Sequence, residues 1–285
     1  MASRSVRLLL PAAALDEGAG VTVRRTIGTP RLRHLDPFLM LDHFGSNDPD
    51  EYIAGFPDHP HRGFITLTYM IDGHMLHRDS MGNRGDLRSG GIQWMKAASG
   101  VIHSEMPQQT AGLMRGFQLW INLPAAEKMS DPEYQDVPAE RIPVVEENGQ
   151  RIRLIAGAHG DRRGPIVDPH TDIQYLDVSL ASGSAFRHAV AADATVFAYV
   201  FEGEARSDDT RLPAHALAVF GGGDDLEIVT EESGARFILV AGRPIGEPIV
   251  QYGPFVMTSD ADIRQAIEDY RQGRLARRPA GSAST

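Results

Sequence analysis

Short apolar segments, each closed by a turn residue, recur at roughly ten-residue intervals through most of the chain. They are rich in β-branched and aromatic side chains, and Gly, Pro, Asn or Asp separates one from the next. Such segments pack as strands, and a regular succession of them indicates a sandwich or a barrel. We therefore expect an all-β fold. The clearest predicted strands are 64–70, 92–96, 116–122, 151–155, 195–201 and 235–240.

One segment near the C-terminus has helical periodicity instead. Ser259 and Asp262 resemble a capping box, and Gly273 could end the helix. The sequence therefore predicts one short C-terminal helix, followed by a frayed tail over 274–285. Between the cap and the glycine, one face of the predicted helix carries Ile263, Ala266, Ile267 and Tyr270.

The chain has 285 residues and no cysteine. The length suffices for two ordinary domains. Without cysteine, disulfides, thiolate zinc sites and cysteine nucleophiles are excluded, so any metal must be bound by His and carboxylates. A net charge of −10 argues against direct binding to nucleic acid or to an anionic membrane. No apolar run reaches the roughly 20 residues of a membrane span, and Leu8–Leu15 reads as a strand, so we expect a cytoplasmic protein.

The proline-containing, charged segment 126–143 predicts a linker between an N-terminal barrel, 1–125, and a C-terminal barrel, 144–285. The two halves share a faint repeat, in which Gly73 aligns with Gly203 and Gly100 aligns with Gly234. This alignment places only apolar residues opposite the candidate ligands described next, namely Ala189, Ala191, Phe237 and Leu239. We therefore predict duplicated barrels, of which the C-terminal one has no metal ligands.

Two short motifs carry the candidate chemistry, His59-Pro60-His61 and His103-Ser104-Glu105. Residues i and i+2 of a strand face the same side, so each motif would present two polar groups together. On neighbouring strands of a barrel, the two motifs would place three nitrogens and one carboxylate around one point. This ligand set suits Fe(II), Mn(II), Ni(II), Cu(II) or Zn(II). A single His-x-His is a weak signal, since surface histidines at that spacing are common and inert, but the second motif strengthens it.

These motifs belong to a longer series that resembles the pirin family of the cupin superfamily. The match is strong over about residues 20–125 and looser in the second half, through 198–203 and 253–257. The segments that carry it are Arg25–Gly28, Leu41–Gly45, Gly55–Phe64, His77–Ser80, Ile92–Met95, Gly100–Pro107 and Gln118–Pro124.

The resemblance implies a bicupin fold, two cupin-type β-barrels in tandem, with one divalent transition metal in the N-terminal barrel. The metal is typically Fe(II), with Ni, Mn, Cu, Co or Zn as alternatives. The ligand pattern of the family falls on His59, His61, His103 and Glu105. One departure is Ile65, where the family commonly has Glu, and this difference could alter the surroundings of the ion or the substrate pocket.

Some pirins cleave the flavonol quercetin with O2. The resemblance therefore implies a metal-dependent dioxygenase of the quercetin 2,3-dioxygenase type, acting on a small flavonol-like phenolic substrate, with Glu105 as a candidate general base. The alternative is a regulator that binds a protein partner, either a transcription factor or a metabolic enzyme, without turnover. A third possibility is a cupin whose metal serves stability alone.

The other polar residues of these motifs receive lesser roles. We expect His77 to be structural or solvent-exposed, and Asp42 and Asp79 to cap backbone N–H groups in turns. Gln118 and Asn122 alternate with apolar residues and could look into the barrel. The histidines of the second half receive no role.

Overall fold

The predicted strands are present in the structure, a computed structural model that describes residues 3–276. β9 (Ile92–Lys96) begins and ends as predicted, whereas several others are longer. The predicted strand 195–201, for example, is the first part of β19 (Thr195–Ser207). It continues because its residues 204–207 pair with β20 (Thr210–Pro213). Strand lengths therefore depend on cross-strand partners that local sequence does not reveal.

The chain forms two units that interleave along the sequence. We call them the site unit and the companion unit. The site unit comprises Ala14–Gly28, Phe38–Ala139 and the chain from Ile245 onward, and the companion unit comprises the chain up to Ala13, Thr29–Pro37 and Glu140–Pro244. The boundaries expected at 125 and 143 follow sequence order and differ from this division. One physical reason is that β1 (Val6–Pro11) pairs with β21 (Ala216–Phe220).

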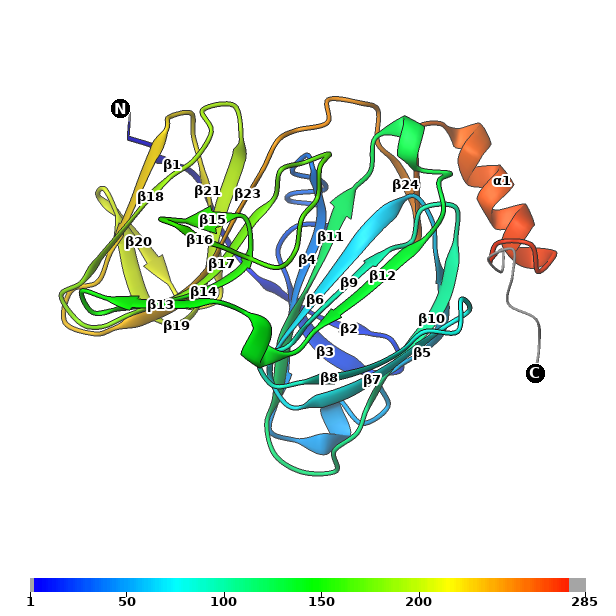
Figure 1. Cartoon of the computed structure of the whole chain (residues 1–285), viewed down its shortest axis with the longest axis horizontal. Helices are drawn as coiled ribbons and strands as arrows, with labels where there is room; N and C mark the ends of the chain where they lie inside the picture. Colours follow the sequence, from blue (N-terminus) through cyan, green and yellow to red (C-terminus); the bar gives the residue numbers. More distant parts are fainter. Residues whose placement is uncertain (1–2, 277–285) are drawn as a thin grey trace. The chain divides into compact units, whose positions relative to one another are not determined.

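The site unit contains two main sheets, whose strands can be followed in Figure 1. The larger sheet has the order β12-β9-β6-β11-β4-β3-β2, and the smaller has the order β5-β10-β7-β8. The further strands of the larger sheet are β2 (Ala13–Glu17), β3 (Val21–Arg25), β4 (Phe38–Ser46), β6 (Phe64–Asp72), β11 (Met114–Asn122) and β12 (Glu133–Val137). The smaller sheet consists of β5 (Phe56–His61), β7 (His74–Asp79), β8 (Arg84–Arg88) and β10 (Val101–Pro107). A one-turn helix, η1 (Pro49–Glu51), precedes β5.

Most of the segment expected to be a linker, positions 126–139, is part of the site unit, and positions 140–143 belong to the companion unit. The segment contains β12, which is antiparallel to β9, between the short helices η2 (Ala125–Glu127) and η3 (Ala139–Arg141). Lys128 of this segment is buried, and its ammonium donates to the Gly63 carbonyl at 2.8 Å, the Asn122 Oδ1 at 2.6 Å and the Val256 carbonyl at 3.1 Å. Each of the three donors of this charged side chain therefore has a partner inside the fold, whereas a linker residue is expected to be solvated.

The predicted C-terminal helix is confirmed as α1 (Asp260–Arg271), capped by Ser259, which accepts from the Asp262 N–H at 3.2 Å. It lies beside the ribbon of β24 (Val250–Tyr252) and β25 (Phe255–Met257) (Figure 1). Leu275, within the predicted frayed tail, is buried against this region, and positions 277–285 of that tail lie outside the described residues. Within the described part, no helix is long and apolar enough to cross a membrane.

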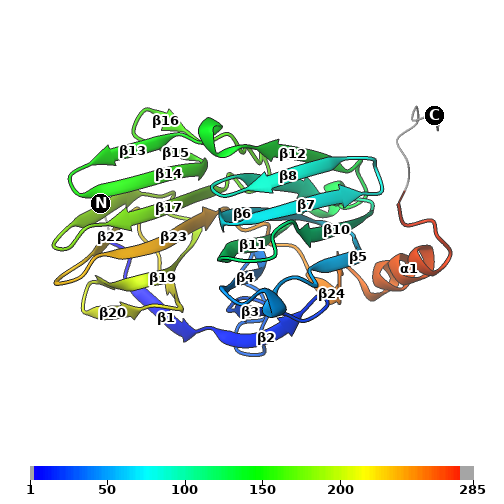
Figure 2. The same cartoon turned by 90° about the horizontal axis from the view of Figure 1, so that it is seen from below.

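The companion unit is built on one sheet of ten strands, with the main path β1-β21-β19-β23-β17-β14-β13. Figure 2 shows β13, β14, β17, β23 and β19 of this path side by side. Buried apolar side chains form its core. Its remaining strands are β13 (Val144–Glu147), β14 (Gln150–Ala156), β15 (Ala158–His159), β16 (Arg162–Arg163), β17 (Gln174–Leu180), β18 (Ala185–Ala189), β22 (Asp225–Val229) and β23 (Ala235–Gly242).

The topology corrects the second half of the proposed repeat. β23 pairs with β19 as β11 pairs with β6, so Phe237 on β23 corresponds to a residue of β11. The counterpart of β10 is β22, since β22 pairs with β18 and with the end of β19, as β10 pairs with β5 and β7. The buried residues of β22 are Leu226 and Ile228. The counterpart strand is therefore apolar inside, although Phe237 and Leu239 were the wrong residues to compare.

Candidate metal centre

Three histidines meet where β5 and β10 run antiparallel. His103 on β10 lies directly opposite His59 on β5, and His61 is two residues after His59 on β5. The His59 and His61 Nε2 atoms are 3.1 Å apart, and the ring centroid of His103 is 4.4 Å from that of His59. One potential ligand atom of each histidine lies within 4.8 Å of the other two. Among the residues that the structure describes, this is the one group of three or more such side chains.

The electrostatics of the group favour neutral imidazoles. His61 and His103 are buried, whereas His59 is half-buried. Burial lowers the pKa of both His61 and His103 well below 6.5, and the neighbouring histidines lower it further. A neutral imidazole offers a lone pair to a metal. The Nε2 atom of His103 is buried and has no hydrogen-bond partner within the described chain, so the donor set fits a divalent transition metal.

Glu105 is placed differently from the expected fourth ligand. The pairing of β10 with β5 shifts register between His103 and Glu105, and Glu105 is outside the described three-histidine group. Its Oε1 accepts from the Thr68 hydroxyl at 3.1 Å, and its Oε2 accepts from the Gln118 amide at 3.0 Å. The Trp120 indole N–H, which can only donate, bonds the Gln118 Oε1 at 3.3 Å and so fixes the orientation of this amide.

Aromatic side chains border the histidines on one side. The His61 ring lies 5.0 Å from the Phe64 ring and 5.1 Å from the Trp120 ring, and these two rings are 4.3 Å apart. A cavity of about 20 Å³ adjoins Glu105, room for roughly one water molecule. A phenolic molecule does not fit in this cavity, and His59 is the partly exposed member of the three histidines. The residues that line this small cavity are Val23, Asp42, Phe44, Phe56, Thr68, Met75, Glu105 and Gln118.

Ile65, the departure from the family pattern, is buried in β6. The hydroxyl of Thr68 on the same strand reaches Glu105, and side chains alternate along a strand. Ile65 is three residues from Thr68 and therefore lies on the face of β6 opposite to the one that carries Thr68.

His77 has a contact that the sequence reading missed. It was expected to be structural or exposed, and it is buried, which agrees with a structural role. The expectation did not include its contact with the site, where its Nδ1 lies 3.3 Å from the Nδ1 of His103. The i, i+2 rule, applied to His77 and Asp79 as it was to His59 and His61, would have placed these two on one face. The Asp79 carboxylate accepts from backbone N–H groups, as predicted, whereas Asp42 forms a bidentate ion pair with Arg25.

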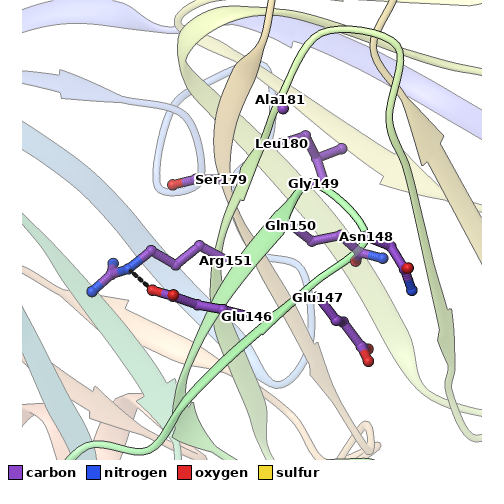
Figure 3. Close-up of a pocket in the computed structure, with 9 residues that line it drawn as sticks. All are labelled: Glu146, Glu147, Asn148, Gly149, Gln150, Arg151, Ser179, Leu180 and Ala181. Carbon is purple, nitrogen blue, oxygen red and sulfur yellow. Dashed lines mark hydrogen bonds and ion pairs between the residues drawn. The ribbon is translucent and has the colours of Figure 1, made fainter.

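The companion unit has two weaker candidate sites. His159 and His188 face each other with their Nδ1 atoms 3.1 Å apart, and burial lowers the pKa of His188 to about 4, but no third ligand joins them in the described chain. A surface hollow on β13 and β14 is lined mostly by exposed side chains (Figure 3). Its Glu146 and Arg151 pair with each other at 3.0 Å. Neither place matches the chemistry of the three histidines.

Comparison with known proteins places this geometry in a family. The model described as Pirin matches residues 20–121, and the model described as Pirin C-terminal cupin domain matches residues 175–276. The chain belongs to the pirin family. The expected fold is thereby confirmed, because a pirin has two cupin domains in tandem, and the single helix of the described chain lies near its C-terminus.

Three similar proteins illustrate the relationship of this pirin to others. A protein of Pseudomonas aeruginosa named "Putative quercetin 2,3-dioxygenase" is 46% identical over 268 residues, which cover 91% of this chain and 94% of the relative. A pirin-like protein of Caulobacter vibrioides is 44% identical, with 96% and 100% covered. The crystal structure of a quercetin 2,3-dioxygenase from Acinetobacter baumannii has a TM-score of 0.89 at 32% identity, with 96% and 99% covered.

Proposed function

We propose that this pirin is a metal-dependent dioxygenase that cleaves a flavonol-like phenolic substrate with O2. The observation that carries the proposal is the group of three mutually close histidines. Two of them are buried, burial lowers their pKa, and a buried carboxylate lies two residues beyond His103 on the same strand. The names of the Pseudomonas and Acinetobacter proteins support the same reaction class. The proposed ligands are His59, His61 and His103, with Glu105 as the fourth.

A bound divalent metal, Fe(II) before Ni, Mn, Cu, Co or Zn, would act as a Lewis acid toward the substrate oxygen and supply the redox chemistry that O2 requires. The protein residues supply the rest. Phe64 and Trp120 form an apolar wall beside His61 against which a flat phenolic ring can pack. The half-buried His59 leaves the entrance to the group on its own side.

Glu105 is the proposed general base. Its carboxylate is held by Thr68 on β6 and Gln118 on β11, so its position depends on strands other than its own. If one of these bonds is exchanged for a bond to the substrate hydroxyl, the carboxylate can accept the hydroxyl proton within the buried interior. Gln118 acts here as a positioning residue, since Trp120 directs its N–H2 group toward the carboxylate.

The test begins with metal analysis of protein purified without added metal. The protein is then reconstituted without oxygen, separately with each candidate metal, and mixed with quercetin and O2. We expect about one metal per chain and loss of the flavonol absorbance. His103→Gln should lose both, whereas His159→Gln, which removes an imidazole of the companion unit, should keep both. Full metal occupancy without flavonol loss for any metal would refute the dioxygenase and favour a regulator, and an absence of bound metal would refute the site.

A further inference from the structure

A buried chain of three side chains ends at His103. The Nδ1 of His103 lies 3.3 Å from the Nδ1 of His77, and the Nε2 of His77 lies 3.4 Å from the Oδ2 of Asp79. All three belong to adjacent strands of the smaller sheet, because β10 pairs with β7 and His103 lies directly opposite Asp79. The side chains of His77 and Asp79 are 1% and 0% exposed. Solvent therefore does not compete for these contacts.

Asp79 is fixed as a hydrogen-bond acceptor. Its Oδ1 accepts from the backbone N–H groups of Met81 and Asn83, both at 2.9 Å, and its Oδ2 accepts from the Asn83 amide at 2.8 Å. Burial alone would raise the pKa of Asp79, but the bonds from His77 and Asn83 outweigh it and hold the pKa below its ordinary value. The carboxylate is therefore ionised at neutral pH, and it can only accept.

The position of His77 is also fixed by packing. The Tyr134 ring stacks on it, with centroids 4.8 Å apart, and Gly85 lies opposite His77 on β8. A Cβ atom at Gly85 would come within 1.8 Å of the Tyr134 hydroxyl oxygen. A glycine is therefore required where the tyrosine approaches, and the tyrosine in turn covers the imidazole.

We propose that Asp79 and His77 are positioning residues that select the tautomer of His103. In the proposed arrangement, Nε2 of His77 donates its proton to the carboxylate, which can only accept, and the His77 Nδ1 serves as the acceptor toward His103. The proton of neutral His103 then lies on its Nδ1 and is donated to His77. The Nε2 of His103, the buried atom without a partner in the described chain, thus keeps its lone pair for a metal.

This inference rests on the proposed metal site, but it makes a prediction for metal-free protein as well. Asp79→Asn replaces one acceptor oxygen with an N–H2 donor while an oxygen remains for the backbone N–H groups. The donor would reverse both hydrogen bonds and place the His103 proton on Nε2, the ligand atom. We expect about a 10- to 100-fold loss of Ni(II) affinity, the range seen when such outer partners of metal ligands are changed.

The decisive experiment is a double-mutant cycle of Ni(II) affinity that combines Asp79→Asn with His77→Phe. The phenylalanine keeps a ring against Tyr134 but removes the hydrogen bonds from residue 77 to Asp79 and His103, which we call the relay. In the His77→Phe background, Asp79→Asn should change the Ni(II) affinity by less than about twofold, because no hydrogen bond then connects residue 79 to His103 through residue 77. An equal loss in both backgrounds would overturn the relay and leave Asp79 a structural residue. The matched control is Asp86→Asn, which alters the more exposed His74–Asp86 pair on the same hairpin and should leave the affinity unchanged.

A second measurement separates this inference from the proposed function. Long-range ¹H–¹⁵N NMR of metal-free, histidine-labelled protein reports which nitrogen of each imidazole is protonated, and the His103 signals are those that His103→Gln removes. We expect His103 protonated at Nδ1 in the wild type and at Nε2 in Asp79→Asn. A wild type protonated at Nε2 would overturn the inference. Failure of wild-type protein to bind any metal would instead refute the proposed site, whatever the tautomer.

Discussion

The buried ammonium of Lys128 leads to a prediction about stability and pH. Burial lowers the pKa of Lys128 from 10.5 to about 8, although Glu247 partly opposes the shift. In the unfolded chain the amine has its ordinary pKa, so between pH 8 and 10.5 the unfolded state holds a proton that the folded state has released. The unfolded state then binds more protons, and stability must rise with pH across this window.

The size of the effect follows from the two pKa values. Each pH unit between them corresponds to about 1.4 kcal/mol, so below pH 8 the charged amine costs the folded state about 3 kcal/mol. Between pH 7 and 9.5, about 2 kcal/mol of this cost is removed. Lys128→Met has no proton to release and should lose this rise. At pH 7 it leaves the carbonyls of Gly63 and Val256 without their donor, at about 1–3 kcal/mol each.

The assay is chemical unfolding at pH 7 and pH 9.5. The free energy of unfolding of the wild type, relative to that of Lys128→Met, should increase by about 2 kcal/mol between the two pH values. Lys96→Met is the matched control, because burial lowers the pKa of Lys96 but Glu127 and Glu133 outweigh it and raise the pKa overall. Its pH dependence should follow the wild type. A difference between wild type and Lys128→Met that is the same at both pH values would refute the reasoning.

Three further predictions concern residues of the site unit. Gly63→Ala should cost at least about 2 kcal/mol more than Gly82→Ala in chemical unfolding, since both glycines have φ near +90° but only the first would place a Cβ 1.9 Å from a carbonyl oxygen. Arg62→Met should lower the unfolding free energy by about 2 kcal/mol, with little salt dependence, because the buried guanidinium bonds Asp269 of α1 at 2.8 Å; an unchanged melting temperature would contradict this. Gln118→Leu should lower kcat/KM for quercetin about tenfold at unchanged metal content, and full activity would remove this residue from the mechanism.

Local patterns predicted what depends on local geometry. The i, i+2 spacing placed His59 with His61, and the cap of α1 was readable from Ser259 and Asp262. The direction of Glu105 was not readable, because it depends on a register shift against β5 and on donors from β6 and β11.

Charged residues inside the fold were the least predictable. Lys128 stands in a segment that reads as solvated, yet its three acceptors come from three separate parts of the chain. Asp79 accepts from backbone N–H groups as predicted, but the contact between His77 and His103 was not predicted, although the i, i+2 rule for strands also applies to His77 and Asp79. The burial of Lys128 was not predictable because its contacts are long-range. The contact of His77 was not predicted because the i, i+2 rule was applied only to His59 and His61.

The interleaving of the two units has a consequence for synthesis. Val256 packs in one apolar cluster with Phe64 and Trp120, the two rings that border His61. Its carbonyl also accepts from Lys128. A ribosome makes all three candidate histidines within the first 103 positions, but it supplies Val256 only after the whole segment 140–244 of the companion unit. During translation, the three histidines, Phe64 and Trp120 are therefore all synthesised before Val256. The apolar cluster beside His61 can be completed only when Val256 has been added.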